Sequence, residues 1–211
     1  MSLTELPDDP DRIDPEPFAG PDNPMRQITR QVAFDDGWTA GRADEVAALF
    51  DGMADGWSAT HGDPVKLAPV GDGLRRGGVN LDGRWLELGS GTGAATRVLR
   101  SEVDRVIACD LSAGMLANAP AEVAPRVRAD AMSLPFRDRR FDGLLLVNMM
   151  LFPAEVDRVL APGGRLLWVN TLGDQTPIHL APTDVLAALP GQWSGVTARA
   201  GTGFWVSVGR D

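Results

Sequence analysis

The chain has 211 residues, which suits one domain that buries a full apolar core without disulfide bonds. Its hydrophobic content is 44%, no apolar run approaches the roughly 20 residues of a membrane span, and its single cysteine excludes an intrachain disulfide, a cysteine-rich zinc site and a CxxC redox pair. The net charge of −9 includes −6 from residues 1–24, so the remainder lacks the concentrated basic surface that nucleic-acid binding needs.

The first 24 residues differ in composition from the rest. They read MSLTELPDDPDRIDPEPFAGPDNP, rich in Pro and Asp and poor in apolar residues, which predicts a disordered acidic leader. The cationic and apolar regions typical of a signal peptide are missing from this stretch, so we expect a cytoplasmic protein. Residues 25–211 are expected to form a single domain that acts on a small molecule.

Apolar residues at helical spacing follow the leader. Met25, Ile28 and Val32 form a first set, and a second set follows the segment DDGWTAG. The second set comprises Val46, Leu49, Phe50, Met53 and Trp57. We expect two amphipathic helices that cover the functional site. Pro64, Pro69 and several glycines then predict a loop.

The rest of the chain alternates short apolar runs with helical segments, which indicates a parallel sheet with crossover helices. Predicted strands cover residues 84–88, 105–109, 126–129, 141–147 and 165–170, and predicted helices cover residues 94–101, 113–118, 153–160 and 183–189. Two further strands, at residues 193–199 and 204–208, are joined by little more than AGTG and must form an antiparallel hairpin. The predicted fold class is α/β, a Rossmann-like open sheet of seven strands, five parallel followed by the hairpin, with helices on both faces.

A glycine-rich motif follows the first predicted strand. In LELGSGTGA, Gly89, Gly91 and Gly93 lead into a predicted helix, and residues 89–94 satisfy the G-x-G-x-x-G/A pattern of dinucleotide-binding loops. Asp110 lies 21 residues after Gly89, where an acidic ribose partner belongs. These residues predict a nucleotide, and taken alone they suit NAD as well as other nucleotides.

Three features favour a sulfonium nucleotide over NAD. The chain has no Tyr and only Lys66 as lysine, so the Tyr–Lys pair of short-chain dehydrogenases is missing. Glu87 precedes the glycines by two residues, where its negative charge would repel a pyrophosphate and attract a sulfonium. The C-terminal hairpin replaces the second parallel half of a dinucleotide fold.

Four segments, in order, resemble the successive motifs of class I S-adenosylmethionine-dependent methyltransferases. They are LELGSGTG, VIACDLSAGMLANA, RADAMSLPFRDRRFDGLLLVN and RVLAPGGRLLWVN. The similarity is greatest to the small-molecule type that includes ubiquinone and menaquinone biosynthesis enzymes, and it covers residues 84–171 closely. It implies methyl transfer from S-adenosyl-L-methionine, with S-adenosyl-L-homocysteine as the product.

The resemblance assigns roles around the methionine part of this cofactor. Gly89, Gly91 and Gly93 would let the loop pass beneath the cofactor, and Glu87 would hold the methionine moiety directly or through water. Asn148, which ends the fourth predicted strand, would face the methionine portion and the methyl group.

The resemblance also assigns the nucleoside contacts. Asp110 would bind both ribose hydroxyls, with Leu111 against adenine. Asp130 would accept the adenine amino group, and Ala131 and Met132 would line the ring. No metal is implied.

The spacing of the three acidic residues supports these roles independently. Glu87, Asp110 and Asp130 are 23 and 20 residues apart, each interval being one helix plus one strand, so all three should end adjacent strands at one edge. For each residue separately a structural role stays open, because Asp110 before LSAGML suits a helix N-cap and Asp130 suits a turn.

The chain departs from the family pattern after the fourth predicted strand. The segment NMMLFPAEVDRVLAPGG is shorter than in relatives and carries no histidine, which leaves His61 and His179 as candidates for a general base. The lack of an NPPY-like run at Asn148 argues against methylation of planar amino groups. Two other functions stay open, an S-adenosylmethionine-binding protein that does not methylate and, less favoured, an NAD(P) oxidoreductase.

Overall fold

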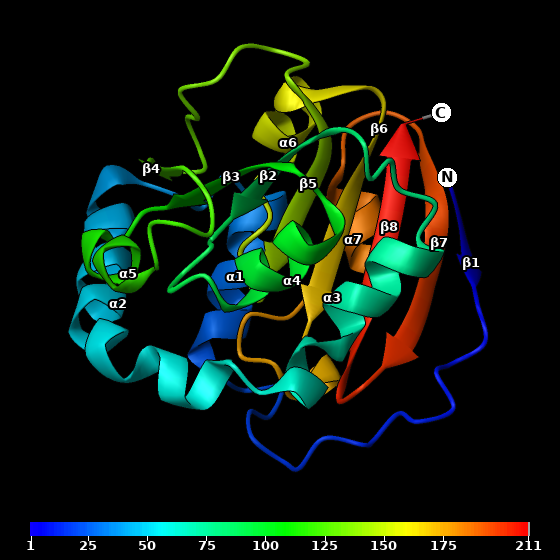
Figure 1. Ribbon diagram of the computed structural model, residues 1–211, viewed down its shortest axis with the longest axis horizontal. Helices are drawn as coiled ribbons and strands as arrows, with labels where there is room; N and C mark the ends of the chain where they lie inside the picture. Colours follow the sequence, from blue (N-terminus) through cyan, green and yellow to red (C-terminus); the bar gives the residue numbers. More distant parts are fainter. Residues whose placement is uncertain (211) are drawn as a thin grey trace.

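The structure is a computed structural model that describes residues 1–210, and its centre is one mixed sheet with helices on both faces (Figure 1). The strands are β1 (Ser2–Glu5), β2 (Arg84–Leu88), β3 (Arg105–Asp110), β4 (Arg126–Arg128), β5 (Phe141–Val147), β6 (Leu160–Asn170), β7 (Trp193–Ala200) and β8 (Gly203–Arg210). The helices are α1 (Pro24–Phe34), α2 (Ala40–His61), α3 (Pro64–Arg76), α4 (Ala94–Glu102), α5 (Ala113–Asn118), α6 (Pro153–Val159) and α7 (Pro182–Ala188), with the 3-10 turn η1 (Gly173–Gln175).

The strands follow the order β1-β7-β8-β6-β5-β2-β3-β4 across the sheet. Strands β2 to β6 are parallel, and β8 lies antiparallel between β6 and β7. The predicted Rossmann-like fold with a C-terminal hairpin is therefore confirmed. Within residues 1–210 the sheet has eight strands rather than the predicted seven, because β1 adds to the edge formed by β7.

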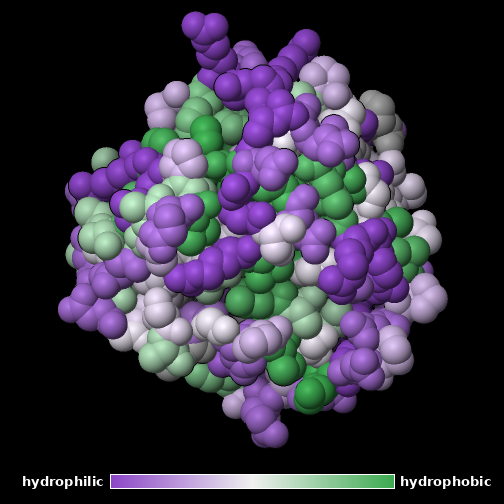
Figure 2. Space-filling model, in the orientation of Figure 1, coloured by the Kyte–Doolittle hydropathy of each residue, from purple (hydrophilic) through white to green (hydrophobic). Residues whose placement is uncertain are grey.

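Side chains of the central strands alternate between two apolar layers. Leu144 and Leu146 of β5 pack in the layer that contains α1, α6 and α7, whereas Leu145 packs in the layer that contains α3 and α4. Burial on both faces explains why these strands read as continuous apolar runs. On the face shown in Figure 2, hydrophilic residues surround separate apolar areas.

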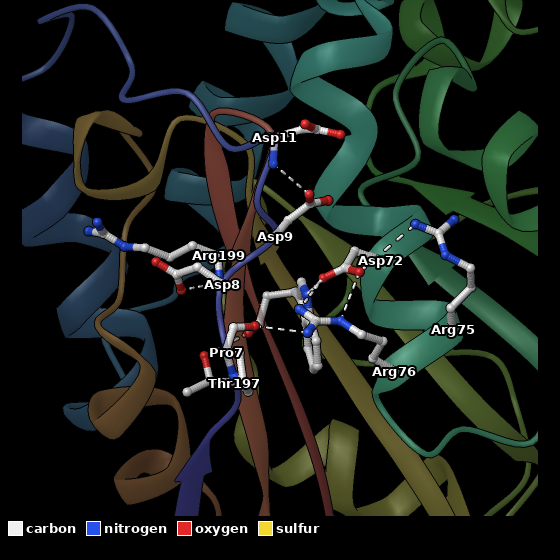
Figure 3. Close-up of polar contacts among 10 residues, drawn as sticks. Pro7, Asp8, Asp9, Asp11, Asp72, Arg75, Arg76, Thr197 and Arg199 are labelled. Carbon is white, nitrogen blue, oxygen red and sulfur yellow. Dashed lines mark hydrogen bonds and ion pairs between the residues drawn. The ribbon is translucent and has the colours of Figure 1, made fainter.

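The acidic leader is ordered against the sheet, contrary to the prediction of disorder. Strand β1 pairs in parallel with β7, and beyond it Leu6 N donates to Thr197 O at 2.8 Å and Asp9 N to Arg199 O at 2.9 Å. Figure 3 shows Pro7, Asp8 and Asp9 beside Thr197 and Arg199. The physical reason is that β7 would otherwise be an edge strand with a free row of backbone donors and acceptors. Pairing of this kind needs backbone groups rather than apolar side chains, so composition did not reveal it.

The segment predicted as a loop with Pro64 and Pro69 is helix α3. Asp63 caps the helix by accepting a hydrogen bond from Val65 N at 2.9 Å, and Pro64 occupies the first turn, where its missing N–H costs nothing. Gly73 faces the sheet so closely that a β carbon there would lie 2.7 Å from Leu167 Cδ1. The glycines of this segment therefore permit close packing of the helix, rather than marking a loop.

A buried polar cluster joins α3 to β8 and to the leader. Asp72 is 5% exposed and accepts hydrogen bonds from Arg76 Nε (2.9 Å), Arg76 Nη2 (2.7 Å) and the indole N–H of Trp205 (2.7 Å). Arg76 also donates to Pro7 O at 2.8 Å, as Figure 3 shows. The leader is thus attached to the body through side chains as well as through β7.

Candidate functional site

The glycine loop connects β2 to α4 at the carboxyl edge of the sheet. Gly89, Gly91 and Gly93 have φ values of +70°, +53° and +84°, a region that side chains with a β carbon rarely adopt. A β carbon at Gly89 would also lie 2.6 Å from Met149 Sδ. The loop therefore requires glycine both for its turn and for its packing against the segment that follows β5.

Glu87 points from β2 into the interior beneath this loop. Its side chain is 1% exposed, and its Oε2 atom has no hydrogen-bond partner. Burial raises the pKa of Glu87 to about 8, the Thr96 hydroxyl opposes that rise, and the Asp110 carboxylate adds to it. A buried acid with an unused oxygen is arranged to receive a hydrogen-bond donor or a cation.

Asp110 ends the neighbouring strand β3 and holds the glycine loop. Its Oδ2 accepts a hydrogen bond from Gly91 N at 2.7 Å, and its Oδ1 accepts one from Ser112 N at 2.9 Å. Burial raises the pKa of Asp110, while these backbone bonds oppose the rise and Asp51 adds a smaller increase. Leu111 follows directly and is partly buried against the core. The carboxylate can accept further bonds from a ligand, because each oxygen has two lone pairs.

Asp130 follows β4 at the same edge and receives two kinds of donor. The indole N–H of Trp38 lies 3.0 Å from Oδ1 and 2.9 Å from Oδ2, and Met132 N donates to Oδ1 at 2.9 Å. Ala131 is buried beside this group, whereas the Met132 side chain is 48% exposed. Trp38 lies between α1 and α2, and no local motif around it indicated this contact.

Asn148 links the ends of β5 and β6. Its Nδ2 donates to Thr171 Oγ1 at 2.8 Å, and its Oδ1 accepts from Thr171 N at 2.9 Å. Its φ of +49° places the backbone in the left-handed region that asparagine tolerates better than most residues. The amide group is therefore held in a fixed orientation at the strand end.

Helix α2 lies against the glycine loop and the start of α5. Ser58 Oγ donates to Thr92 Oγ1 at 2.8 Å, and a β carbon at Gly91 would lie 3.6 Å from Trp57 Nε1. Asp51 accepts hydrogen bonds from Gly114 N at 2.8 Å and from the Ser112 hydroxyl. This placement agrees with the expectation that N-terminal helices cover the site. The polar contacts of Ser58 and Asp51 arise from tertiary packing, and no sequence motif indicated them.

The two histidines lie in separate clusters. His61 stacks on Trp57 with ring centroids 3.6 Å apart, and its Nδ1 lies 3.0 Å from Trp57 O. His179 Nδ1 lies 3.0 Å from Asn170 Oδ1, and its ring packs edge-on against Phe204. Burial lowers the pKa of each histidine, with Lys66 adding to the effect at His61. Both rings are therefore favoured in the neutral form that a general base requires.

Neither a metal site nor a membrane span emerges from the described part of the chain. Among residues 1–210 no group of three His, Cys, Asp or Glu side chains is arranged to hold a metal ion. The helices of these residues include none with the length and apolar character to cross a bilayer. Cys109 is free and buried, and burial raises its pKa to about 12.

Comparison with known proteins agrees with this architecture. Residues 86–168 match the family model described as a methyltransferase domain. The demethylmenaquinone methyltransferase of Mycobacterium tuberculosis strain H37Rv is 33% identical over 136 residues, which cover 58% of this chain and 57% of that protein. The chain thus spans little more than half the length of the curated relatives that it matches. The match confirms the resemblance drawn from the four motifs, which occupy nearly the same segment.

Solved structures extend the similarity beyond that segment. The DhpI–SAH complex is 25% identical with a TM-score of 0.65, and the alignment covers 81% of this chain and 97% of DhpI. A solved structure from Methanococcus maripaludis is 18% identical with a TM-score of 0.58, and the alignment covers 78% of this chain and 91% of that one. The second likeness concerns the fold alone.

Proposed function

We propose that this chain, whose residues 86–168 match a methyltransferase domain, transfers a methyl group from S-adenosylmethionine to a small, partly apolar acceptor. The observation that carries the proposal is the arrangement of Glu87, Asp110 and Asp130 at the carboxyl edge of adjacent strands, around a glycine loop. Ligands of open α/β sheets bind at this edge. The solved relative DhpI holds S-adenosylhomocysteine, the product that such a transfer would leave.

The residues at the edge fit the parts of this cofactor. In this proposal Asp110 accepts hydrogen bonds from the ribose hydroxyls, and Asp130 accepts one from the adenine amino group. Glu87, with its unpartnered oxygen, suits the cationic methionine portion. Because the pKa of Glu87 is about 8 without a ligand, a neighbouring cation would favour its ionised form and be stabilised by it in turn.

When bound, S-adenosylmethionine supplies an electrophilic methyl group on a sulfonium. The acceptor's lone pair forms the new bond to the methyl carbon while the electrons of the carbon–sulfur bond pass to sulfur. The protein's main contribution to such an in-line displacement is to hold the two reactants in line, an effect worth up to about 7 to 11 kcal/mol. An acceptor that must lose a proton needs a base, and His179 and His61 are the proposed candidates.

The acceptor class rests on two lines of support. The curated relatives are named demethylmenaquinone methyltransferases, which argues for a quinone-like or similarly apolar small molecule. Met149 lies two residues after β5 and is partly buried, so it can contribute apolar contact surface near the edge. The relatives named as methyltransferases offer no support for a binding protein without transfer activity. A free, buried thiol at Cys109 fits a reducing cytoplasm, and the near-neutral body of the chain fits a small molecule better than a nucleic acid.

The experiment is a turnover assay with S-adenosylmethionine and a soluble, short-chain demethylmenaquinone that dithionite keeps reduced to the quinol, because the oxidised quinone ring is not a nucleophile. Product S-adenosylhomocysteine and a quinone heavier by one methylene are measured together by mass spectrometry. Acceptor-dependent formation of both supports the proposal. Cofactor binding without transfer to this quinone or to related phenols and naphthols would contradict the acceptor class.

A further inference from the structure

Trp38 occupies a position that the proposed function assigns to the nucleotide. It lies between α1 and α2, is 7% exposed, and shares its indole N–H between both oxygens of Asp130 at 3.0 and 2.9 Å. Its ring packs edge-on against Phe152 with centroids 5.2 Å apart, in the same apolar cluster as Ala131. The indole therefore contacts Asp130 with its donor and packs in the cluster that includes Ala131.

An indole resembles adenine in the properties that matter at this place. Both are flat, bicyclic and aromatic, and both present an N–H donor at the rim. Trp38 lies across both oxygens of Asp130, with Met132 N also on Oδ1, so the indole stands where an adenine amino group would have to approach this carboxylate. Trp38 and the nucleotide would thus compete for the same acceptor.

Helix α2, which continues from Trp38, is attached in a way that permits movement. Among its described side chains, Ala43 and Ala54 are buried and Val46 and Phe50 pack partly buried against the core, so most of the surface of this 22-residue helix stays outside the core. The hydrogen bonds that join it to the site involve Asp51 with the start of α5 and Ser58 with Thr92. Segments with few buried apolar contacts open at low free-energy cost.

We propose that Trp38 is a gate residue, which fills the adenine position on Asp130 when no nucleotide is bound and must leave it for the cofactor to enter. This inference rests on the proposed function, because it takes S-adenosylmethionine as the ligand. In addition, Trp38, in the segment between α1 and α2, lowers cofactor affinity by competing with adenine for Asp130. Removal of the indole donor should then tighten binding instead of weakening it.

The test compares Trp38→Phe with Trp193→Phe in titrations with S-adenosylhomocysteine. Trp193 is a matched control. It begins β7, far along the sheet from β4 and Asp130, and its indole N–H donates to Pro190 O at 2.7 Å. Trp38→Phe keeps an aromatic ring and loses the bond to Asp130, so its dissociation constant should fall about tenfold, equivalent to about 1.4 kcal/mol. The control should bind as the unaltered protein does.

A second measurement follows Trp38 directly in the full chain. Protein labelled with 5-fluorotryptophan gives a fluorine resonance for Trp38, assigned by its loss in Trp38→Phe. Saturation with S-adenosylhomocysteine should move this resonance as the indole leaves Asp130. Weaker or unchanged binding by Trp38→Phe, or an unmoved resonance at saturation, would overturn the gate while leaving the proposed function intact. A failure of both proteins to bind would overturn the proposed function and the gate with it.

Discussion

Asp110 combines two tasks at the centre of the site. Its carboxylate fixes the glycine loop through Gly91 N and the start of α5 through Ser112 N, and it keeps lone pairs for a ligand. The position of this residue followed from the spacing between Glu87 and Asp130, because each interval matches one helix and one strand. The contacts of Trp38, Asp51 and Ser58 could not be predicted in this way, since they arise where α2 packs on the edge.

Substitution of Asp110 tests whether this residue contributes to cofactor binding. Asp110→Ala is expected to weaken S-adenosylhomocysteine binding by about 2 to 4 kcal/mol, because two charge-assisted bonds are lost. Isothermal titration measures the change. Asp104→Ala, an exposed residue just before the opposite end of β3, is the control and should leave affinity unchanged. Near-normal affinity for Asp110→Ala would show that the ribose assignment is wrong.

Glu87 should couple cofactor binding to proton release. In the free protein its pKa is about 8, so the carboxyl group is mostly protonated at neutral pH, and a bound cation lowers that pKa. Binding of S-adenosylmethionine near pH 7 should therefore release close to one proton, and affinity should rise with pH until it levels off above about pH 8. Titrations in buffers of different ionisation enthalpy count the protons.

Glu87→Gln provides the control for this linkage. The side-chain amide that this substitution introduces cannot ionise, so proton release on binding and the pH dependence of affinity should both disappear. S-adenosylmethionine should bind this variant more weakly than the unaltered protein at pH 8. Proton uptake by the unaltered protein, or equal proton release by the Gln variant, would contradict the assigned role.

At the scale of elements, segments with regularly spaced apolar residues were predictable. The closely packed helix α3 and the edge strand β1 were not. The spacing of apolar residues and the turn residues predicted five elements with ends close to those observed: strands β2, β3 and β5 and helices α4 and α5. Helix α3 was missed because its two prolines and its two interior glycines, Gly71 and Gly73, contradict helix propensity, which tertiary packing overrides. Strand β1 was missed because its stabilisation comes from backbone pairing with β7.

Packing of α3 against the sheet predicts a contrast between two helical glycines. At Gly73 a β carbon would lie 2.7 Å from Leu167 Cδ1 and 3.1 Å from Trp205 Cγ, so Gly73→Ala should lower the free energy of unfolding by about 1 to 3 kcal/mol. Gly52 in α2 has open space around its β-carbon position, and Gly52→Ala should raise that energy by about 0.5 to 1 kcal/mol. Urea unfolding measures both, and a stabilised Gly73→Ala would contradict the close approach.

The cluster around Asp72 predicts a second difference in stability. Asp72→Ala leaves the buried Trp205 N–H without an acceptor and removes the partner of Arg76, which should cost about 3 kcal/mol. Asp72→Asn keeps one acceptor oxygen and should cost less. Thermal and urea unfolding of both variants provide the comparison, and equal stability of Asp72→Ala and the unaltered protein would show that the cluster does not hold α3 in place.

At the scale of the whole molecule, the candidate site residues lie together at the carboxyl edge of the sheet. The parallel strands bring Glu87, Asp110 and Asp130 together, the glycine loop supplies a close backbone surface, and α2 covers both. The fold class was predictable from the order of strands and helices, as was the position of the acidic residues along the edge. The placement of α2 and Trp38 at that edge depends on contacts between distant segments, which a single sequence does not reveal.

We expect this edge to bind S-adenosylmethionine and its product. Isothermal titration of the full chain with S-adenosylmethionine, S-adenosylhomocysteine and NADH measures this binding, with Asp110→Ala titrated in parallel. Both sulfur nucleotides should bind saturably and one-to-one, more weakly to the substituted protein, and NADH should not bind. Binding of NADH without either sulfur nucleotide, or no binding of any of the three, would contradict this expectation.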